Sequence, residues 1–235
     1  MILEEVVNER HPVHNLTVAS LREAPPESSQ AINVTSGSTT LWARGLSPFF
    51  LGPCSLYDGR TAKNVENAWQ YSKVYAQFIG PDNEILPSYL EWAQKGWAKN
   101  YADRYPMGKG AIPEFVFWEG DRLGYIEARK RVYLPLYAQS VVKTDSFARL
   151  QEIVSKGEPV TLIDFDVHAA GTQNLYQALQ NPHKKFGHGF VLYGLLTGEI
   201  DHTGEFVGKQ HETGSPPAQK RRPGRLFENF SSREI

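Results

Sequence analysis

Hydrophobic and polar positions alternate along most of the chain with a helical period. Asn64 is a suitable N-cap for a helix that continues to about Phe78. Residues 88–104 predict a second helix and residues 121–141 a third, which Pro135 should kink because proline removes an i→i−4 hydrogen bond. Two shorter helices are expected over 146–156 and 174–180.

Strand patterns are rarer. Residues 159–167, PVTLIDFDV, combine apolar and β-branched side chains with alternation and predict a strand. The apolar run of residues 188–196 fits either a buried helix or a strand. Asp58-Gly59 indicates the turn of a short hairpin. The predicted fold is therefore a helix-rich α+β single domain with a small sheet.

The composition of the chain divides it into three parts. Residues 1–40 are polar and predict an N-terminal arm, loosely structured or with short strands, and residues 41–205 form the expected main domain. Residues 206–235 are expected to form a flexible basic tail, which is either simply solvated or contacts phosphate backbones. The basic residues of this tail are Lys220, Arg221, Arg222 and Arg225.

Length and composition limit the classes of protein. The 235 residues, 40% of them hydrophobic, suffice for a substantial core. No apolar run approaches the roughly 18 residues that cross a bilayer, and charged residues interrupt the N-terminus where a signal peptide needs an apolar stretch, so we expect a cytoplasmic protein. Cys54 is the only cysteine, which excludes an intrachain disulfide. The net charge of −1 gives no overall attraction to a polyanion.

Four polar residues recur at helical spacing in the first core helix. Glu66, Gln70, Lys73 and Gln77 lie four, three and four residues apart and fall on one narrow face. Gln70 is placed to link Glu66 to Lys73 through hydrogen bonds. The face is either an ordinary solvated surface or a carboxylate, an amide and an amine held over a substrate.

A metal site is an alternative use of the acidic and histidine residues near the predicted strand. Asp166 and His168 lie two apart, and His188 would complete a set of two histidines and one carboxylate. The other interpretation is that His188, which lies between two glycines, shapes a pocket entrance. There is no glycine-rich phosphate loop, which argues against a dehydrogenase or a kinase. We expect neither a metal nor another cofactor.

The segment LSPFFLGPCSLYDGRTAKNVENAWQYSK resembles the opening signature of the NADAR family. The likeness extends more loosely over residues 41–197, through EARKRVYLPLYAQSV, TLIDFDV and FGHGFVLYGLL. Asn67 stands where the family usually has histidine, and His188-Gly189 where it has glycine-asparagine. The matching residues are Leu46, Ser47, Phe49, Pro53, Asp58, Gly59, Val65, Glu66, Gln70 and Lys73.

The resemblance implies that residues 41–205 are a catalytic domain, which hydrolyses a ribosyl N-glycosidic bond in an ADP-ribosylated base or a related nucleotide. Such cleavage develops positive charge on the sugar, so a nearby carboxylate lowers the barrier, and Glu66 is the first candidate. Lys73 would act as an acid or, with a lowered pKa, as an amine nucleophile. Asp164 or Asp166 would supply a second carboxylate, because side chains two apart on a strand point the same way.

A nucleotide substrate also requires stacking and polar contacts. Trp69, Trp118 and Tyr125 are candidates to stack on a base, and Arg129 to meet a pyrophosphate. Two alternatives to the enzyme remain open: a non-catalytic module that binds ADP-ribose-like nucleotides or modified nucleic acid, and a nucleic-acid-associated protein that acts through its basic tail. The remaining predicted substrate-binding residues are Asn67, Gln70 and His188.

Overall fold

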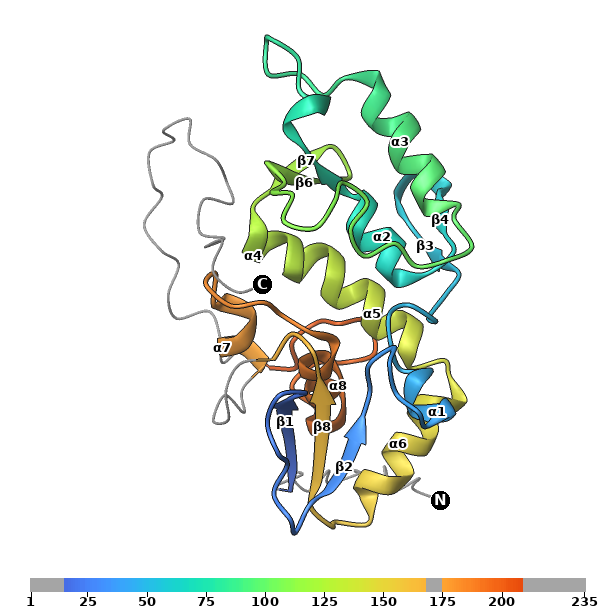
Figure 1. The fold of residues 1–235 in the computed structure, drawn as a ribbon, viewed down its shortest axis with the longest axis vertical. Coiled ribbons are helices and arrows are strands. Elements are labelled where there is room, and N and C mark those ends of the chain that lie inside the picture. Colours follow the sequence, from blue (N-terminus) through green and yellow to red (C-terminus); the bar gives the residue numbers. More distant parts are fainter. Residues whose placement is uncertain (1–14, 168–174, 209–235) are drawn as a thin grey trace, which may run out of the picture.

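The structure, a computed structural model, describes residues 15–167 and 175–208. Within these residues, helices and small sheets share a hydrophobic core, as the α+β prediction requires (Figure 1). The predicted tail residues 209–235, the first 14 residues of the predicted arm and His168 lie outside the described residues. No helix in the described ranges is both long enough and apolar enough to cross a membrane.

A parallel sheet occupies one end of the molecule (Figure 1). The predicted strand is β8 (Val160–Asp164), with β1 (Leu16–Ser20) and β2 (Gln30–Asn33) paired in parallel on either side of it. All five residues of β8 are buried, as is typical of a central parallel strand. Since β1 and β2 lie within the predicted arm, the sheet joins the arm to the predicted catalytic domain.

The apolar run that sequence left ambiguous forms helix α8 (His188–Thr197). The helix packs against β1, β8 and α5, and seven of its ten residues are buried, so apolar side chains are required all round it. The predicted amphipathic helix is α6 (Asp145–Ser155), whose first turn is capped by the hydroxyl of Thr144.

The predicted hairpin joins β3 (Cys54–Ser55) to β4 (Thr61–Ala62) in antiparallel pairing. Its turn has a positive φ at both Asp58 (52°) and Gly59 (70°), which asparagine, aspartate and glycine tolerate best. Asp58-Gly59 was therefore the correct turn signal.

The first core helix is shorter than predicted. Asn64 caps α2 (Val65–Tyr71) by accepting a hydrogen bond from the Asn67 amide, but the helix ends long before Phe78. Residues 73–74 instead form β5 (Lys73–Val74), which pairs with β6, and a 3-10 turn follows (Ala76–Phe78). The pairing of β5 with β6 therefore prevails over the helical spacing of polar residues that predicted a longer helix.

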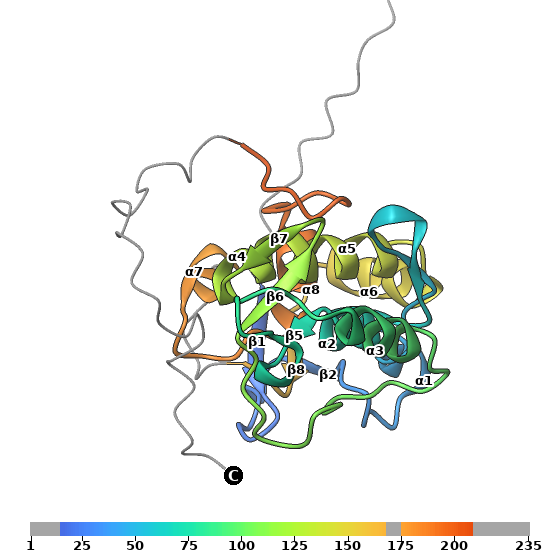
Figure 2. The same ribbon diagram turned by 90° about the horizontal axis from the view of Figure 1, so that it is seen from above.

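The second predicted helix is also shortened. Helix α3 (Pro87–Trp97) begins with proline in its first turn and ends seven residues before the predicted end at 104. Helix α2 contacts α3 on one side and α5 on the other (Figure 2). Residues 98–104 leave the helical path, and three of their backbone groups bind the side chain of Asn67 in α2.

The third predicted helix begins later than expected. Residues 121–123 form β7 (Asp121–Leu123), which pairs with β6 (Phe115–Trp118), and helix α4 (Tyr125–Ala128) follows. A π-helical turn (Arg129–Tyr133) then leads into α5 (Leu134–Val141). Pro135 therefore interrupts the regular helix with a widened turn and does not break it, and the combined helix crosses the middle of the molecule (Figure 1). The remaining helices are α1 (Leu41–Arg44) and α7 (Leu175–Gln180).

Candidate functional site

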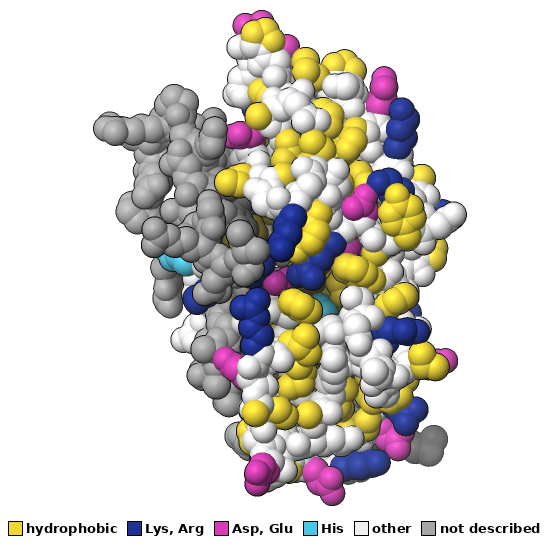
Figure 3. All heavy atoms as spheres, viewed as in Figure 1, with side chains coloured by type: hydrophobic (Ala, Val, Ile, Leu, Met, Phe, Trp, Pro, Cys, Tyr) yellow, Lys and Arg dark blue, Asp and Glu magenta, His cyan; other side chains and the backbone are white. Residues whose placement is uncertain are grey.

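A cavity of about 90 Å³ lies where β8 ends and where α2 and α8 begin. Three carboxylates, a guanidinium and an imidazole contribute to its walls. On the face shown in Figure 3, Lys and Arg side chains gather at mid-height beside hydrophobic groups, and acidic and histidine side chains are visible between them. The lining residues are Thr35, Ser36, Ser47, Pro48, Phe49, Glu66, Trp69, Gln70, Arg104, Tyr133, Asp164, Phe165, Asp166, Phe186, Gly187 and His188.

The predicted polar face of α2 is assembled at this cavity. Gln70 Nε2 donates to Glu66 Oε1 (2.9 Å), and Lys73 Nζ donates to Gln70 Oε1 (2.7 Å). Lys73 reaches this position from β5, with its ammonium 4.9 Å from the centre of the Trp69 ring. Lys73 is joined to the cavity through Gln70 and does not line the cavity itself. Gln77, the fourth member of the predicted face, is exposed and lies near Met107.

The array holds two groups whose pKa values differ from their usual ranges. Burial raises the pKa of Glu66, while the hydrogen bond from Gln70 and the charges of Lys73 and Arg104 oppose the rise. Burial lowers the pKa of Lys73 to about 8, against the attraction of Glu66 and Asp166. Such paired displacements are typical of sites that move protons.

Asp164 is the most enclosed carboxylate of the cavity. It is 2% exposed, and its oxygens accept hydrogen bonds from the backbone amides of Phe165 (2.6 Å) and Gly189 (2.8 Å). His188 Nδ1 lies 3.2 Å from Asp164 Oδ2, while Nε2 donates to the carbonyl of Val34 (2.9 Å). These contacts occupy both oxygens of Asp164. The role of Asp164 is therefore to fix the start of α8 and to orient His188.

Asp166 lies beyond the end of the strand and belongs to the cavity mouth. Its Oδ2 is 3.0 Å from Arg104 Nη2, and its Oδ1 is 3.8 Å from Lys185 Nζ. The Arg104 guanidinium lies between two aromatic rings, 5.6 Å from that of Tyr105 and 5.2 Å from that of Phe165. Both rings are about half exposed, so Arg104 makes its cation–π contacts near the protein surface.

The structure separates the predicted binding residues into two groups. Trp69, Gln70 and His188 line the cavity together with the predicted catalytic residues Glu66, Asp164 and Asp166. The other four do not line it. These four are Asn67, Trp118, Tyr125 and Arg129.

Local contacts explain why three of these side chains, Trp118, Tyr125 and Arg129, are elsewhere. Trp118 is 7% exposed and packs edge-on against Tyr57 in the core. Arg129 is buried beneath the Tyr125 ring and donates hydrogen bonds to the carbonyls of Leu179 and Asn181. Arg129 thus fastens the chain after α7 and does not line the cavity.

Sequence reasoning missed Arg104 and Tyr133. Arg104 was assigned to a helix, and its partner Asp166 is 62 residues away, so no local pattern joins them. Tyr133 enters the cavity from the π-helical turn, which has no sequence signal of its own besides Pro135. Ser47 was visible only as part of the motif that carries the resemblance to NADAR proteins.

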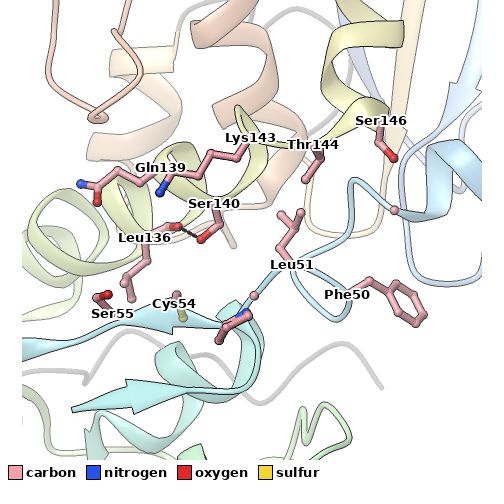
Figure 4. A pocket seen from close by; sticks show the side chains of 13 residues that line it. Phe50, Leu51, Cys54, Ser55, Leu136, Gln139, Ser140, Lys143, Thr144 and Ser146 are labelled. Atoms are coloured by element: carbon pink, nitrogen blue, oxygen red, sulfur yellow. Dashed lines mark hydrogen bonds between the residues drawn. The ribbon is translucent and has the colours of Figure 1, made fainter. Parts of the chain in front are cut away.

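A larger cavity of about 310 Å³ lies between the segment 45–55 and residues 136–146 (Figure 4). Its walls carry hydroxyl and amide groups and one cation, Lys143, but no carboxylate. Cys54 lies at its base, and burial raises the pKa of the thiol to about 11, which keeps it protonated and a poor nucleophile. Of these two cavities, the smaller one is therefore the one lined by carboxylates.

The proposed metal set is not assembled in the described residues. No three His, Cys, Asp or Glu side chains group there as metal ligands, and His168 falls outside the described ranges. Asp166 pairs with Arg104, and His188 is engaged by Val34 and Asp164.

Fold and site together define an α+β protein with a buried carboxylate, an amide and an amine at a small charged cavity. The model of a family of unknown function (DUF6939) matches residues 13–182. The match covers most of the chain, and the protein belongs to this family. A comparison with curated proteins gave no match.

Proposed function

We propose that this protein is an N-glycosidase that hydrolyses a ribosyl N-glycosidic bond in an ADP-ribosylated base or a related nucleotide, without a metal. The observation that carries the proposal is the array of Glu66, Gln70 and Lys73 at the cavity. In this reaction water replaces the base at the anomeric carbon, and the base leaves with a proton.

Glu66 has the properties that this reaction requires of its first carboxylate. It is 6% exposed, so its charge acts through little water and stabilises positive charge on the sugar strongly. Gln70 occupies Oε1, and among the described residues Oε2 has no hydrogen-bond partner. Oε2 is therefore the atom that orients and deprotonates the attacking water.

Lys73 acts through Gln70 in this proposal and not as a nucleophile. A lysine ammonium only donates hydrogen bonds, so the amide oxygen of Gln70 faces Lys73 and its nitrogen faces Glu66. The ammonium thus fixes the amide in the orientation that supports an ionised Glu66.

Asp166 is the better of the two candidates for the assisting carboxylate, since Asp164 is enclosed at the start of α8. Arg104 beside Asp166 offers a guanidinium to a phosphate or to a base carbonyl, and Trp69 supplies an aromatic face. In this proposal Arg104 meets the phosphate of a nucleotide, and Trp69 stacks on its base.

The resemblance of residues 46–73 to the NADAR signature supports the same activity, because its Glu66, Gln70 and Lys73 are the residues of the array. We place the activity in the cytoplasm, and nucleic acid that carries the modified base is a further partner.

The first experiment is incubation, without added metal, with DNA carrying ADP-ribosylated guanine and with a free ribosylated pyrimidine. Release of product is followed by mass spectrometry. We expect release by the wild type and a loss of at least about a hundredfold in Glu66→Gln, which keeps the shape and removes the charge. Circular dichroism should show the same fold for both.

Two outcomes contradict the proposal. Equal rates for wild type and Glu66→Gln would remove Glu66 from the mechanism. No release from either substrate, with ADP-ribose still bound by calorimetry, would identify a binding module in place of an enzyme.

A further inference from the structure

Asn67 follows the proposed catalytic Glu66 in α2, but its side chain points away from the cavity. It is completely buried, and it makes three hydrogen bonds to one loop. Its Nδ2 donates to the carbonyls of Lys99 (3.2 Å) and Tyr101 (2.9 Å), and its Oδ1 accepts from the amide of Asp103 (2.8 Å). Both donors and the acceptor of the amide are therefore used on backbone groups.

The loop that Asn67 binds leads directly to the cavity. The carboxylate of Asp103 accepts a hydrogen bond from the Tyr71 hydroxyl (2.7 Å), which adds a second attachment to α2. The same carboxylate pairs with Lys99 of the loop (2.6 Å). The next residue, Arg104, lines the cavity and pairs with Asp166. The backbone that carries Arg104 is thus fixed by the helix that carries Glu66.

We propose that Asn67 is a positioning residue, which fixes the backbone of residues 99–103 and thereby holds Arg104 at the cavity that contains Glu66. The catalytic consequence rests on the proposed N-glycosidase function, whereas the structural consequence does not. An imidazole has only two hydrogen-bonding atoms and cannot make the three contacts. This accounts for asparagine at the position where the NADAR signature has histidine.

The position of Arg104 can be followed through the pKa of Glu66, which would not change if Asn67 had a purely structural role. The charged groups that face Glu66 are Lys73 from β5, Arg104 from the loop and Asp166 after β8, with Tyr133 beside them. The charge of Arg104 lowers the pKa of Glu66. A displaced Arg104 should therefore raise the pH at which Glu66 titrates.

The experiment is a titration of ¹³C-labelled glutamate carboxyls by NMR in the full chain, with Glu66 assigned by its absence in Glu66→Gln. In Asn67→Ala, the Glu66 midpoint should move to higher pH, in the same direction as in Arg104→Gln. The double variant should move no further than Arg104→Gln alone, because both changes act through one guanidinium.

The control is Thr144→Ala, which removes the cap of α6 far from the loop and costs stability without altering the charges around Glu66. An unchanged midpoint in Asn67→Ala, or additive shifts in the double variant, would overturn the proposal. If Asn67→Ala does not fold, Asn67→Ser keeps a hydroxyl at the position and permits the same comparison. Since the titration needs no turnover, a failed glycosidase assay leaves this result interpretable.

Discussion

At the scale of single residues, the site depends on the direction in which one amide points. Gln70 lies between Glu66 and Lys73 and donates to one while accepting from the other. An ionised Lys73 favours this arrangement, because an ammonium only donates hydrogen bonds, whereas a neutral amine also offers a lone pair that could accept from the amide nitrogen. As the pKa of Lys73 is about 8, the array should begin to lose its order above that pH.

Turnover by the wild type should therefore depend on pH in two ways. It rises as Glu66 ionises, at a pH above the usual range of a glutamate because burial raises its pKa, and it falls above about pH 8 as Lys73 loses its proton. Lys73→Met should shift the rising limb to higher pH, because the lost charge lowered the pKa of Glu66, and should abolish the falling limb. Rates measured from pH 4 to 10, with the exposed Lys156→Met as control, test both shifts. A falling limb that persists in Lys73→Met contradicts the assignment.

The sequence located some of these residues and not others. The spacing of Glu66, Gln70 and Lys73 was sufficient to predict their hydrogen bonds, even though Lys73 lies on a strand and not on the helix. Arg104 was not predictable, since its position depends on a loop fixed by Asn67 and on an ion pair with a residue far along the chain. The spacing of residues predicts which side chains lie together within one element, but it does not predict which side chains meet between two elements.

At the scale of elements, a glycine lies at the contact between helices α2 and α3. Gly96 of α3 faces the ring of Tyr71, and a Cβ at that position would lie only 1.9 Å from the ring. Tyr71 is itself 2% exposed and bonded through its hydroxyl to Asp103, so it has little room to move.

Gly96→Ala should consequently destabilise the protein by about 1–3 kcal/mol, the usual cost of overpacking, despite the better helix propensity of alanine. The measurement is urea unfolding followed by circular dichroism. Gln94→Ala, at an exposed position of the same helix, is the control and should change stability by no more than about 0.5 kcal/mol. A neutral or stabilising Gly96→Ala would show that the two helices can separate.

Element boundaries were the weakest part of the sequence prediction. Helix α2 was expected to reach Phe78, but Lys73 and Val74 pair with Val116 and Phe115. That pairing satisfies the backbone through a partner some 40 residues away, which the local pattern does not reveal. Caps and turns were predicted well by contrast, as Asn64 and Asp58-Gly59 show, because their geometry is decided within a few residues.

At the scale of the whole molecule, the parallel sheet joins segments that lie far apart in the sequence. The strand that the sequence predicted best lies between two strands from residues 1–40. β8 pairs with β1 on one side and with β2 on the other, and the buried Asp164 ends β8 at the cavity. The predicted division at residue 41 therefore runs through a sheet whose strands depend on one another.

Removal of residues 1–40 should prevent folding, because β8 would lose both neighbours and its apolar residues would face water. A chain that starts at residue 15 keeps every described element and is the matched control. Thermal unfolding of the two chains, followed by near-ultraviolet circular dichroism, makes the comparison. A cooperative transition in the chain that lacks residues 1–40 would restore the interpretation of that segment as an accessory arm.

The same sheet sets the order in which the protein is completed during synthesis. β1 and β2 leave the ribosome well before β8, which begins at Val160, and β8 is the strand with which both pair in the described part of the chain. The two early strands must remain unpaired while the intervening residues are made, a period in which exposed strand edges favour aggregation. Asp164 is the last residue of β8, so the carboxylate-lined cavity forms only after β8 has been made, and nascent chains should depend on chaperones until then.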